Sequence, residues 1–476
     1  MGPSQTRKTE SALTKSANLE LAPDEMRSFG YRVIDVLVEH FANMQDKPVG
    51  AKAEAGWIRP LLAAPLSDDP CDPHLLLDML ERDIFPNNLN VAHPRFFAFV
   101  PGPNNFMSAM ADVLASGFNV FNGTWLGGSA AAAMELQVIE WLGGFCGLPQ
   151  GAGGLFVSGG SVANMTALVA ARHAVLDDRM EGATIYFSDQ THSSVERALR
   201  VIGFQAEQIR HIPSDREYRL PMEALASALA ADRAAGLRPF CVIANAGTTN
   251  TGAVDPLSEL AELCRAEGMW LHADGAYGAT AIVSERGRRA LNGLDQVDSL
   301  SLDPHKWLFQ SFECGCVLLR DAALLKKAFQ IMPEYLRDVH RGVDEVHPCD
   351  YGIQLTRSFR ALKVWLSLRT FGLEAFRAAI DHGFELAECA ERELRSRPGW
   401  EILSPAQMGI VCFHYAGRDV SHSAIVDAML RDGYAFLTST KLGGITALRL
   451  CTINPRTTIE EIRGTIDRLD RFAREC

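Results

Sequence analysis

Short apolar runs alternate with longer amphipathic segments between residues 105 and 365. The runs are bounded by Gly, Asp or Asn and lie at Leu155–Val157, Thr184–Phe187, Cys241–Ala244, Met269–His272, Ser299–Leu302 and Val317–Leu319. Strands that alternate with helices predict a large α/β domain in which helices wrap a mostly parallel sheet. Ligands of such sheets bind beyond the carboxyl ends of the strands, so the residues that follow these runs are the candidates for chemistry.

The two flanking regions follow other patterns. Residues 1–22 are polar and aperiodic, and we expect a flexible tail. Pro23 and Asp24 then signal a helix start, and an apolar stripe recurs at helical spacing at Met26, Phe29, Val33, Leu37 and Phe41. This pattern predicts an N-terminal helical segment over residues 23–104, whose stripe must be covered, for example by a partner subunit. Over residues 366–476, a long helix, a strand at Ile410–Tyr415, another helix and a strand at Leu448–Ile453 predict a small C-terminal α+β domain.

Composition narrows the function classes. A formal charge of −12 provides no basic surface for nucleic acid or for an anionic membrane, so neither is an expected partner. No apolar run is long enough to cross a bilayer, and the polar start does not resemble a signal peptide, so the expected compartment is the cytoplasm. The 11 cysteines are scattered without paired CxxC motifs, so we expect neither a disulfide framework nor a metal site.

Lys306 is the first residue that points to a particular chemistry. It follows a predicted strand and a proline-bounded turn, in the segment Asp303-Pro304-His305-Lys306-Trp307. Taken alone, a lysine in such a loop is most simply a solvated side chain. The alternative is a lysine that forms a Schiff base with a carbonyl group.

Three upstream segments favour the Schiff base. Gly160 and Ser161 lie in a strand-to-helix turn whose backbone N–H groups could hold a phosphate, although such a turn is also a common helix cap. Asp274 ends an apolar strand and is either a turn residue or a carboxylate that keeps a pyridine nitrogen protonated. His192 follows another strand and is either structural or stacked on such a ring. Together these residues predict pyridoxal 5′-phosphate (PLP) as the cofactor.

Three motifs carry a resemblance to a known family. They are Ser-Asp-Gln-Thr-His-Ser-Ser at 188–194, Leu-His-Ala-Asp-Gly-Ala-Tyr at 271–277 and Asp-Pro-His-Lys-Trp at 303–307. In this combination, the chain resembles the group II PLP-dependent amino-acid decarboxylases, and most of all their aromatic-L-amino-acid branch. The similarity extends from about Asp24 to the end of the chain. It implies the aminotransferase-like fold of type I, with a seven-stranded sheet, and a homodimer with active sites at the interface.

The resemblance also implies roles for individual residues. Lys306 would bind the cofactor covalently, Asp274 would face its pyridine nitrogen and His192 would stack on its ring. Further cofactor contacts are implied for Gly160, Ser161, Thr249, Ala276, Ser299 and His305, and a substrate pocket for Phe99, Pro101, Phe121 and Phe312. Asp303 stands where the animal enzymes commonly have asparagine, and an ionised carboxylate there would repel the phosphate.

The reaction implied is α-decarboxylation of an L-amino acid, of the tyrosine, DOPA, phenylalanine or tryptophan type, to the amine and CO₂. The proton donor stays open between Tyr351 and His192, because an ungapped alignment puts Pro348 opposite the family's loop tyrosine and a short gap recovers Tyr351. If Tyr351 is the donor, Tyr351→Phe raises the yield of aldehyde and peroxide.

Other activities remain open as well. The pocket is apolar, which argues against an acidic substrate unless a residue such as Arg95 supplies a cation. The alternatives are therefore an aliphatic or acidic amino-acid decarboxylase, an aromatic aldehyde synthase, and a non-catalytic protein of the same fold. The intact Lys306, Asp274 and His192 count against the last of these.

Overall fold

The computed structural model describes residues 19–63, 65–331, 345–418 and 420–475. Most of the tail expected at residues 1–22 therefore lies outside the described residues. The chain divides after Leu89 into an N-terminal unit and a larger unit that begins at Asn90. The sequence analysis ended the N-terminal segment at residue 104, whereas residues 90–104 belong with the larger unit.

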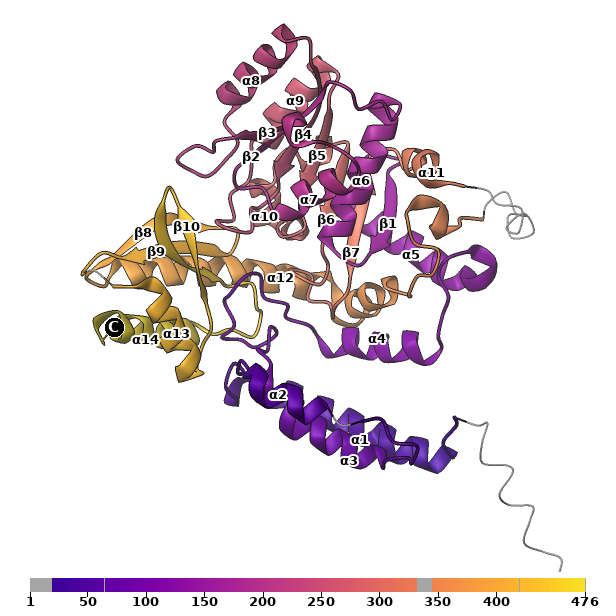
Figure 1. Cartoon of the computed structure of the whole chain (residues 1–476), viewed down its shortest axis with the longest axis vertical. Coiled ribbons are helices and arrows are strands. Elements are labelled where there is room, and N and C mark those ends of the chain that lie inside the picture. The colour runs from indigo at the N-terminus through magenta and orange to yellow at the C-terminus, as the bar shows by residue number, and fades with distance from the viewer. Residues whose placement is uncertain (1–18, 64, 332–344, 419, 476) are drawn as a thin grey trace, which may run out of the picture. The chain divides into compact units, whose positions relative to one another are not determined.

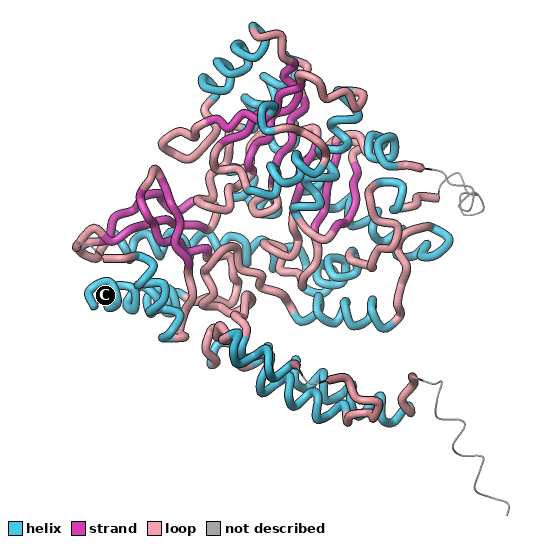
Figure 2. Tube along the Cα trace, in the orientation of Figure 1, coloured by secondary structure: helices cyan, strands magenta, loops and turns pink. Residues whose placement is uncertain are grey.

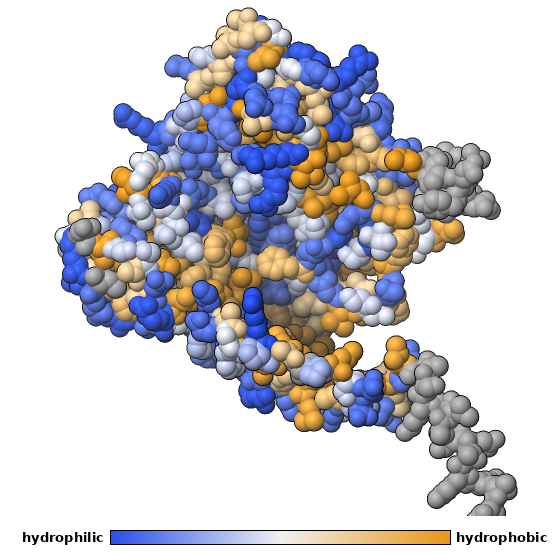
Figure 3. All heavy atoms as spheres, in the orientation of Figure 1, coloured by the Kyte–Doolittle hydropathy of each residue, from blue (hydrophilic) through white to orange (hydrophobic). Residues whose placement is uncertain are grey.

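The N-terminal unit contains the helices α1 (Pro23–Ala42), α2 (Ala55–Leu62) and α3 (Pro73–Met79). Pro23 stands at the first position of α1, where a missing N–H costs nothing. The ring of Phe29 on α1 meets that of His74 on α3 edge to face at 5.6 Å. No residue of α1 is buried, and Figure 3 shows apolar residues on the surface of this unit. The predicted stripe therefore lacks a full cover within the described chain.

A seven-stranded sheet forms the centre of the larger unit (Figures 1 and 2). Its order is β1-β7-β6-β5-β4-β2-β3, and only β7 runs antiparallel to its neighbours. This sheet confirms the predicted fold class. The strands are β1 (Gly153–Val157), β2 (Ala183–Ser188), β3 (Ile209–Ile212), β4 (Arg238–Asn245), β5 (Trp270–Asp274), β6 (Ser299–Leu302) and β7 (Gly315–Leu319). Six of them contain the predicted apolar runs. The edge strand β3 escaped notice because its two middle residues, Arg210 and His211, are polar.

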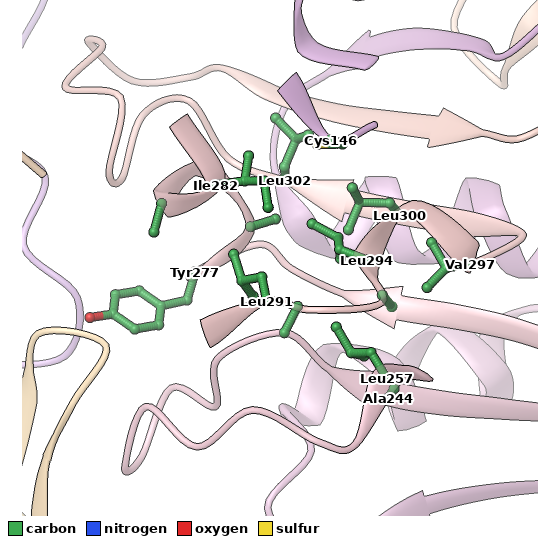
Figure 4. Close-up of a cluster of buried hydrophobic side chains, with 14 of the residues drawn as sticks. Cys146, Ala244, Leu257, Tyr277, Ile282, Leu291, Leu294, Val297, Leu300 and Leu302 are labelled. Carbon is green, nitrogen blue, oxygen red and sulfur yellow. The ribbon is translucent and has the colours of Figure 1, made fainter. Parts of the chain in front are cut away.

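Helices surround the sheet in this part of the chain (Figure 2). They are α4 (Phe106–Gly117), α5 (Trp125–Phe145), α6 (Gly160–Leu176), α7 (Ser193–Val201), α8 (Met222–Ala234), α9 (Leu257–Glu267), α10 (Glu285–Ala290) and α11 (Ala323–Phe329). Figure 4 shows part of the core, in which Leu294 lies next to Leu300 of β6 and Leu257 next to Ala244 of β4. Tyr277 points away from this group, and its hydroxyl donates to the carbonyl of Met408 at 2.5 Å.

The C-terminal part begins with α12 (Ala361–Arg395), a helix that is interrupted at Gly372, where φ is +74°. The boundary placed at residue 365 by the sequence thus falls inside this helix. A four-stranded antiparallel sheet follows in the order β10-β11-β9-β8. Its elements are β8 (Trp400–Gln407), β9 (Ile410–Tyr415), α13 (His422–Asp432), β10 (Thr438–Leu442), β11 (Ile445–Cys451) and α14 (Ile459–Glu475). No helix among the described residues is both long and apolar enough to cross a membrane.

Candidate active site

A cavity of about 350 Å³ lies where several strands of the large sheet end. The segments that follow β1, β2, β4, β5 and β6 all contribute to its wall. Small-molecule sites typically occupy about 300–1,000 Å³, so the cavity suits one cofactor or substrate. Its lining includes almost all of the predicted cofactor residues, namely Gly160, Ser161, His192, Thr249, Asp274, Ala276, His305 and Lys306.

Lys306 reaches this cavity from the loop that follows β6. Its Nζ lies 2.9 Å from Oδ2 of Asp303, whose side chain is buried. The backbone N–H of Lys306 also donates to the Asp303 carbonyl at 2.9 Å, which forms a tight turn. The Asp303 carboxylate therefore pairs with the lysine itself, an arrangement that the sequence did not reveal.

Asp274 stands at the end of β5 with its carboxylate held by three donors. Oδ2 accepts from Nδ2 of Asn164 at 3.0 Å, and Oδ1 accepts from the Ser301 hydroxyl and the Ala276 N–H, both at 3.2 Å. These contacts fix a buried carboxylate at the cavity wall. A carboxylate in this position can face a protonated pyridine nitrogen, which is the role predicted for Asp274.

His192 caps the N-terminus of α7 and lines the same cavity. Its Nδ1 accepts from the backbone N–H of Ser194 at 3.2 Å, so the hydrogen of the neutral ring lies on Nε2. Burial lowers the pKa of this imidazole, more strongly than the nearby Asp274 carboxylate raises it. With its pKa lowered, His192 is mainly neutral at pH 7, and its Nε2 carries a hydrogen that can be donated.

The turn between β1 and α6 forms a cradle of small residues, which comprises Gly159, Gly160 and Ser161. No side chain of the described residues caps α6, so the first backbone N–H groups of this 17-residue helix can donate hydrogen bonds to an anion. A Cβ added at Gly160 would lie 2.6 Å from that of Ala276, which shows why glycine is needed. An anion cradle, a lysine and a buried carboxylate around one cavity fit a phosphorylated pyridine aldehyde such as PLP.

The structure does not place Ser299 at the cavity. Its Oγ accepts from Nε1 of Trp270 at 2.8 Å and contacts Nδ1 of His272 at 2.8 Å. Ser299 starts β6, whereas the cavity lies at the other end of the parallel strands, where Ser301 contacts Asp274. Ser299 instead belongs to a hydrogen-bonded chain behind the site, in which His272 Nε2 contacts Oδ1 of Asn164 at 3.0 Å.

Tyr351 and the four predicted pocket residues are not among the residues that line the cavity. Tyr351 lies in a 3₁₀ turn, Pro348–Tyr351, and faces a second, smaller cavity next to β1. The ring of Phe312 packs edge to face on that of His305, a residue of the cavity lining, at 5.0 Å. Phe99 and Phe312 remain 60% and 57% exposed, whereas Phe121 is half-buried and Pro101 is buried.

Asn164 and Ser194 are site residues that the sequence analysis missed. Asn164 connects Asp274 to Ser194, because its side-chain amide also donates to the Ser194 hydroxyl at 3.2 Å. This hydroxyl contacts Nδ1 of His192 at 2.8 Å. The signal was a polar residue in the apolar stripe of α6, since Asn164 lies one helical turn before the buried Leu168.

Comparison with known proteins agrees with this geometry. Residues 57–416 match the family description "Pyridoxal-dependent decarboxylase conserved domain". The chain belongs to this family, and it is a PLP-dependent decarboxylase of fold type I.

Several relatives and solved structures are similar to the chain over most of its length. The chain is 48% identical to an aromatic-L-amino-acid decarboxylase from Bacillus atrophaeus, over 97% of this chain and 98% of the relative. It is 31% identical to a phenylacetaldehyde synthase from Petunia hybrida, over 92% of each. The solved structure of Oryza sativa TDC with PLP and tryptamine matches with a TM-score of 0.91 and 28% identity, over 96% of this chain and 99% of that one.

Proposed function

We propose that this enzyme removes the α-carboxylate of an aromatic L-amino acid and releases the amine and CO₂. The observation that carries the proposal is the convergence of Lys306, Asp274 and His192 on one cavity. The relatives named for aromatic substrates support the substrate class.

PLP bound in this cavity would supply an electron sink for the electron pair that departing CO₂ leaves at the α-carbon. Lys306 would bind the cofactor covalently, and the cradle at Gly160 and Ser161 would hold the phosphate. Asp274 would keep a proton on the pyridine nitrogen, because three donors hold its carboxylate in place. Thr249 and Ala276 would border the ring.

His192 is our candidate for the group that protonates the α-carbon. Neutral His192 carries its hydrogen on Nε2, so the ring takes up a proton at Nδ1, and the imidazolium ion can then donate its other hydrogen from Nε2. The lowered pKa makes this imidazolium a stronger acid than a free imidazolium ion, which favours transfer of the proton to the α-carbon. Tyr351 faces a different cavity, so within one chain His192 is the better placed of the two candidates.

Two arginines, Arg95 and Arg449, are already bonded to other groups of the protein. Arg95, the cation considered for an acidic substrate, instead pairs with Glu461 at 3.0 Å and donates from Nε to the Tyr434 carbonyl at 2.7 Å. The guanidinium of Arg449 donates hydrogen bonds to the backbone carbonyls of Phe99, Thr249 and Asn250. An acidic side chain needs a dedicated cation, and neither arginine is placed to serve as one.

We also propose a homodimer in the cytoplasm. The incompletely covered α1 and the exposed rings of Phe99 and Phe312 are surfaces that a second copy of the chain would bury. The ten cysteines of the described residues are free thiols, which suits a reducing compartment.

A panel of amino acids, scored at once for CO₂, amine, aldehyde and peroxide, tests this function. We expect the aromatic amino acids to give equal amounts of CO₂ and amine, and Lys306→Ala to give neither. Lys326→Ala, a lysine change on α11 away from the cavity, is the control and should keep full activity. Turnover confined to aspartate, glutamate or aliphatic amino acids would refute the substrate class. Aldehyde and peroxide in place of amine would identify an aldehyde synthase, the second activity among the relatives.

A further inference from the structure

Asp303 has an oxygen without a partner in a place where an anion is to bind. The residue is 1% exposed, and its Oδ2 pairs with Lys306 Nζ at 2.9 Å. Its Oδ1 is buried as well, yet no group among the described residues donates a hydrogen bond to it. Burying a carboxylate oxygen without a hydrogen-bond donor costs free energy. Binding of a ligand could remove this cost, either because the carboxyl group becomes protonated or because the ligand brings a donor.

The same carboxylate lies against the cradle that we assign to the phosphate. A Cβ added at Gly160 would lie 3.1 Å from Oδ2 of Asp303, and one added at Gly159 would lie 3.9 Å from Oδ1. A phosphate held by the first N–H groups of α6 would therefore be next to Asp303. Two negative groups this close repel each other strongly inside a protein.

Lys306 is the cation that balances Asp303 before the cofactor binds. On the same loop, Nε2 of His305 lies 3.6 Å from Oδ2, and burial lowers the pKa of His305 as it does that of His192. The acids and thiols around Asp303 are Asp274 and Glu313 in the wall of the cavity, Cys316 of β7 and the preceding Cys314. The cations are Lys363 of α12, which acts on both His305 and Cys314, and Arg360, which pairs with Glu313 at 2.6 Å.

This balance changes when Lys306 bonds to the cofactor. Its nitrogen forms a double bond to the carbonyl carbon, and the carbonyl oxygen leaves as water with two of the three ammonium hydrogens. The nitrogen then keeps one hydrogen and its charge, so the condensation itself neither takes up nor releases a proton. The nitrogen that pairs with Asp303 is thus left with one hydrogen instead of three, at the moment at which a phosphate arrives beside this carboxylate.

We propose that Asp303 takes up one proton from solvent when PLP binds, and that it serves in the loaded enzyme as a neutral hydrogen-bond donor to the phosphate. The inference rests on the proposed cofactor role of Lys306 and of the Gly159–Ser161 cradle. It makes Asp303 a residue that couples cofactor affinity to pH. The neutral acid removes the repulsion and gives the unpartnered carboxyl group a hydrogen to donate.

The dissociation constant of PLP, titrated from pH 6 to pH 8, tests the proposal. Uptake of one proton weakens binding by about tenfold for each pH unit. Asp303→Asn already carries a neutral donor, so the ratio of the wild-type constant to that of Asp303→Asn should rise by about tenfold per pH unit. Asp112→Asn is the matched control, because it removes a carboxylate that pairs with Lys363 at 3.0 Å outside the cavity. Its pH dependence should equal that of the wild type.

Infrared difference spectra of loaded minus cofactor-free wild-type enzyme provide a second readout that does not depend on the variant. The band of a protonated carboxyl group should appear on loading, shift when aspartate is labelled with ¹³C, and be missing in Asp303→Asn. A constant affinity ratio across the pH range, without this band, would overturn the proposal. Loss of the pH dependence in His305→Gln would assign the proton to His305 instead. If wild-type enzyme fails to bind PLP at any pH, the cofactor site itself is refuted.

Discussion

The side-chain amide of Asn164 donates a hydrogen bond to Oδ2 of Asp274 at 3.0 Å. Its carbonyl accepts from Nε2 of His272, and Nδ1 of His272 contacts the Ser299 hydroxyl, which in turn accepts from Trp270. Since each donor meets an acceptor, this buried chain determines both the tautomer of His272 and the orientation of the Asp274 carboxylate.

Replacement of Asn164 should therefore weaken cofactor binding. Asn164→Ala removes a hydrogen bond to a carboxylate, which is worth about 1.5–3 kcal/mol, so the dissociation constant of PLP should rise by about tenfold to a hundredfold. Fluorescence or absorbance titration measures it. Asn292→Ala is the matched control, because that amide donates to the Ser258 hydroxyl at 3.1 Å in an exposed hydrogen bond away from the cavity. An affinity equal to that of the wild type in Asn164→Ala would show that the chain is structural alone.

The same chain predicts a stability difference that depends on pH. Burial lowers the pKa of His272 to about 4, against about 6.5 in an unfolded chain. The unfolded state binds the proton more tightly, so the stability that neutral His272 provides is complete above pH 6.5 and is lost as the pH falls towards 4. The loss over this window is about 3 kcal/mol.

Thermal unfolding of wild type and His272→Gln should reveal this loss. Glutamine keeps a donor and an acceptor but does not titrate, so the melting-temperature advantage of the wild type should shrink between pH 7.5 and pH 5. A constant or growing advantage would mean that His272 does not titrate in this manner.

Changes at His192 and Tyr351 should affect the products differently. His192→Gln removes the proton carrier at the cavity, so we expect turnover to fall by about a hundredfold or more and the share of aldehyde to rise. Tyr351→Phe should leave the ratio of amine to aldehyde unchanged, because Tyr351 faces the second cavity. Product ratios by liquid chromatography settle the question, and a raised aldehyde share in Tyr351→Phe would restore the tyrosine as donor.

A charge placed on α1 should break the proposed dimer. Val38 is 47% exposed, so Val38→Glu costs the isolated chain little but would put a carboxylate into an apolar interface. Light scattering should then report a mass nearer to one chain than to two. The neighbouring Glu39→Gln is the control and should leave the mass as in the wild type. A dimer that persists in Val38→Glu would place the interface elsewhere.

The sequence predicted the sheet well because buried strands require continuous apolar runs, as in Cys241–Ala244. The sequence also predicted that Lys306, Asp274 and His192 lie close together, because all three stand at or after the ends of strands that meet at one edge of the sheet. The choice between Ser299 and Ser301 could not be made, because both point to the same face of β6 and only their partners tell them apart. Similarly, nothing in the order of residues reveals that Asp303 pairs with Lys306.

The covalent anchor is the central claim, and borohydride reduction tests it most directly. Reduction of the PLP-loaded enzyme makes the bond between lysine and cofactor permanent, and mass spectrometry of the peptides locates it. We predict a single cofactor adduct, on Lys306, and none on the protein Lys306→Ala. An adduct on another lysine, or none in wild-type enzyme saturated with PLP, would contradict the account.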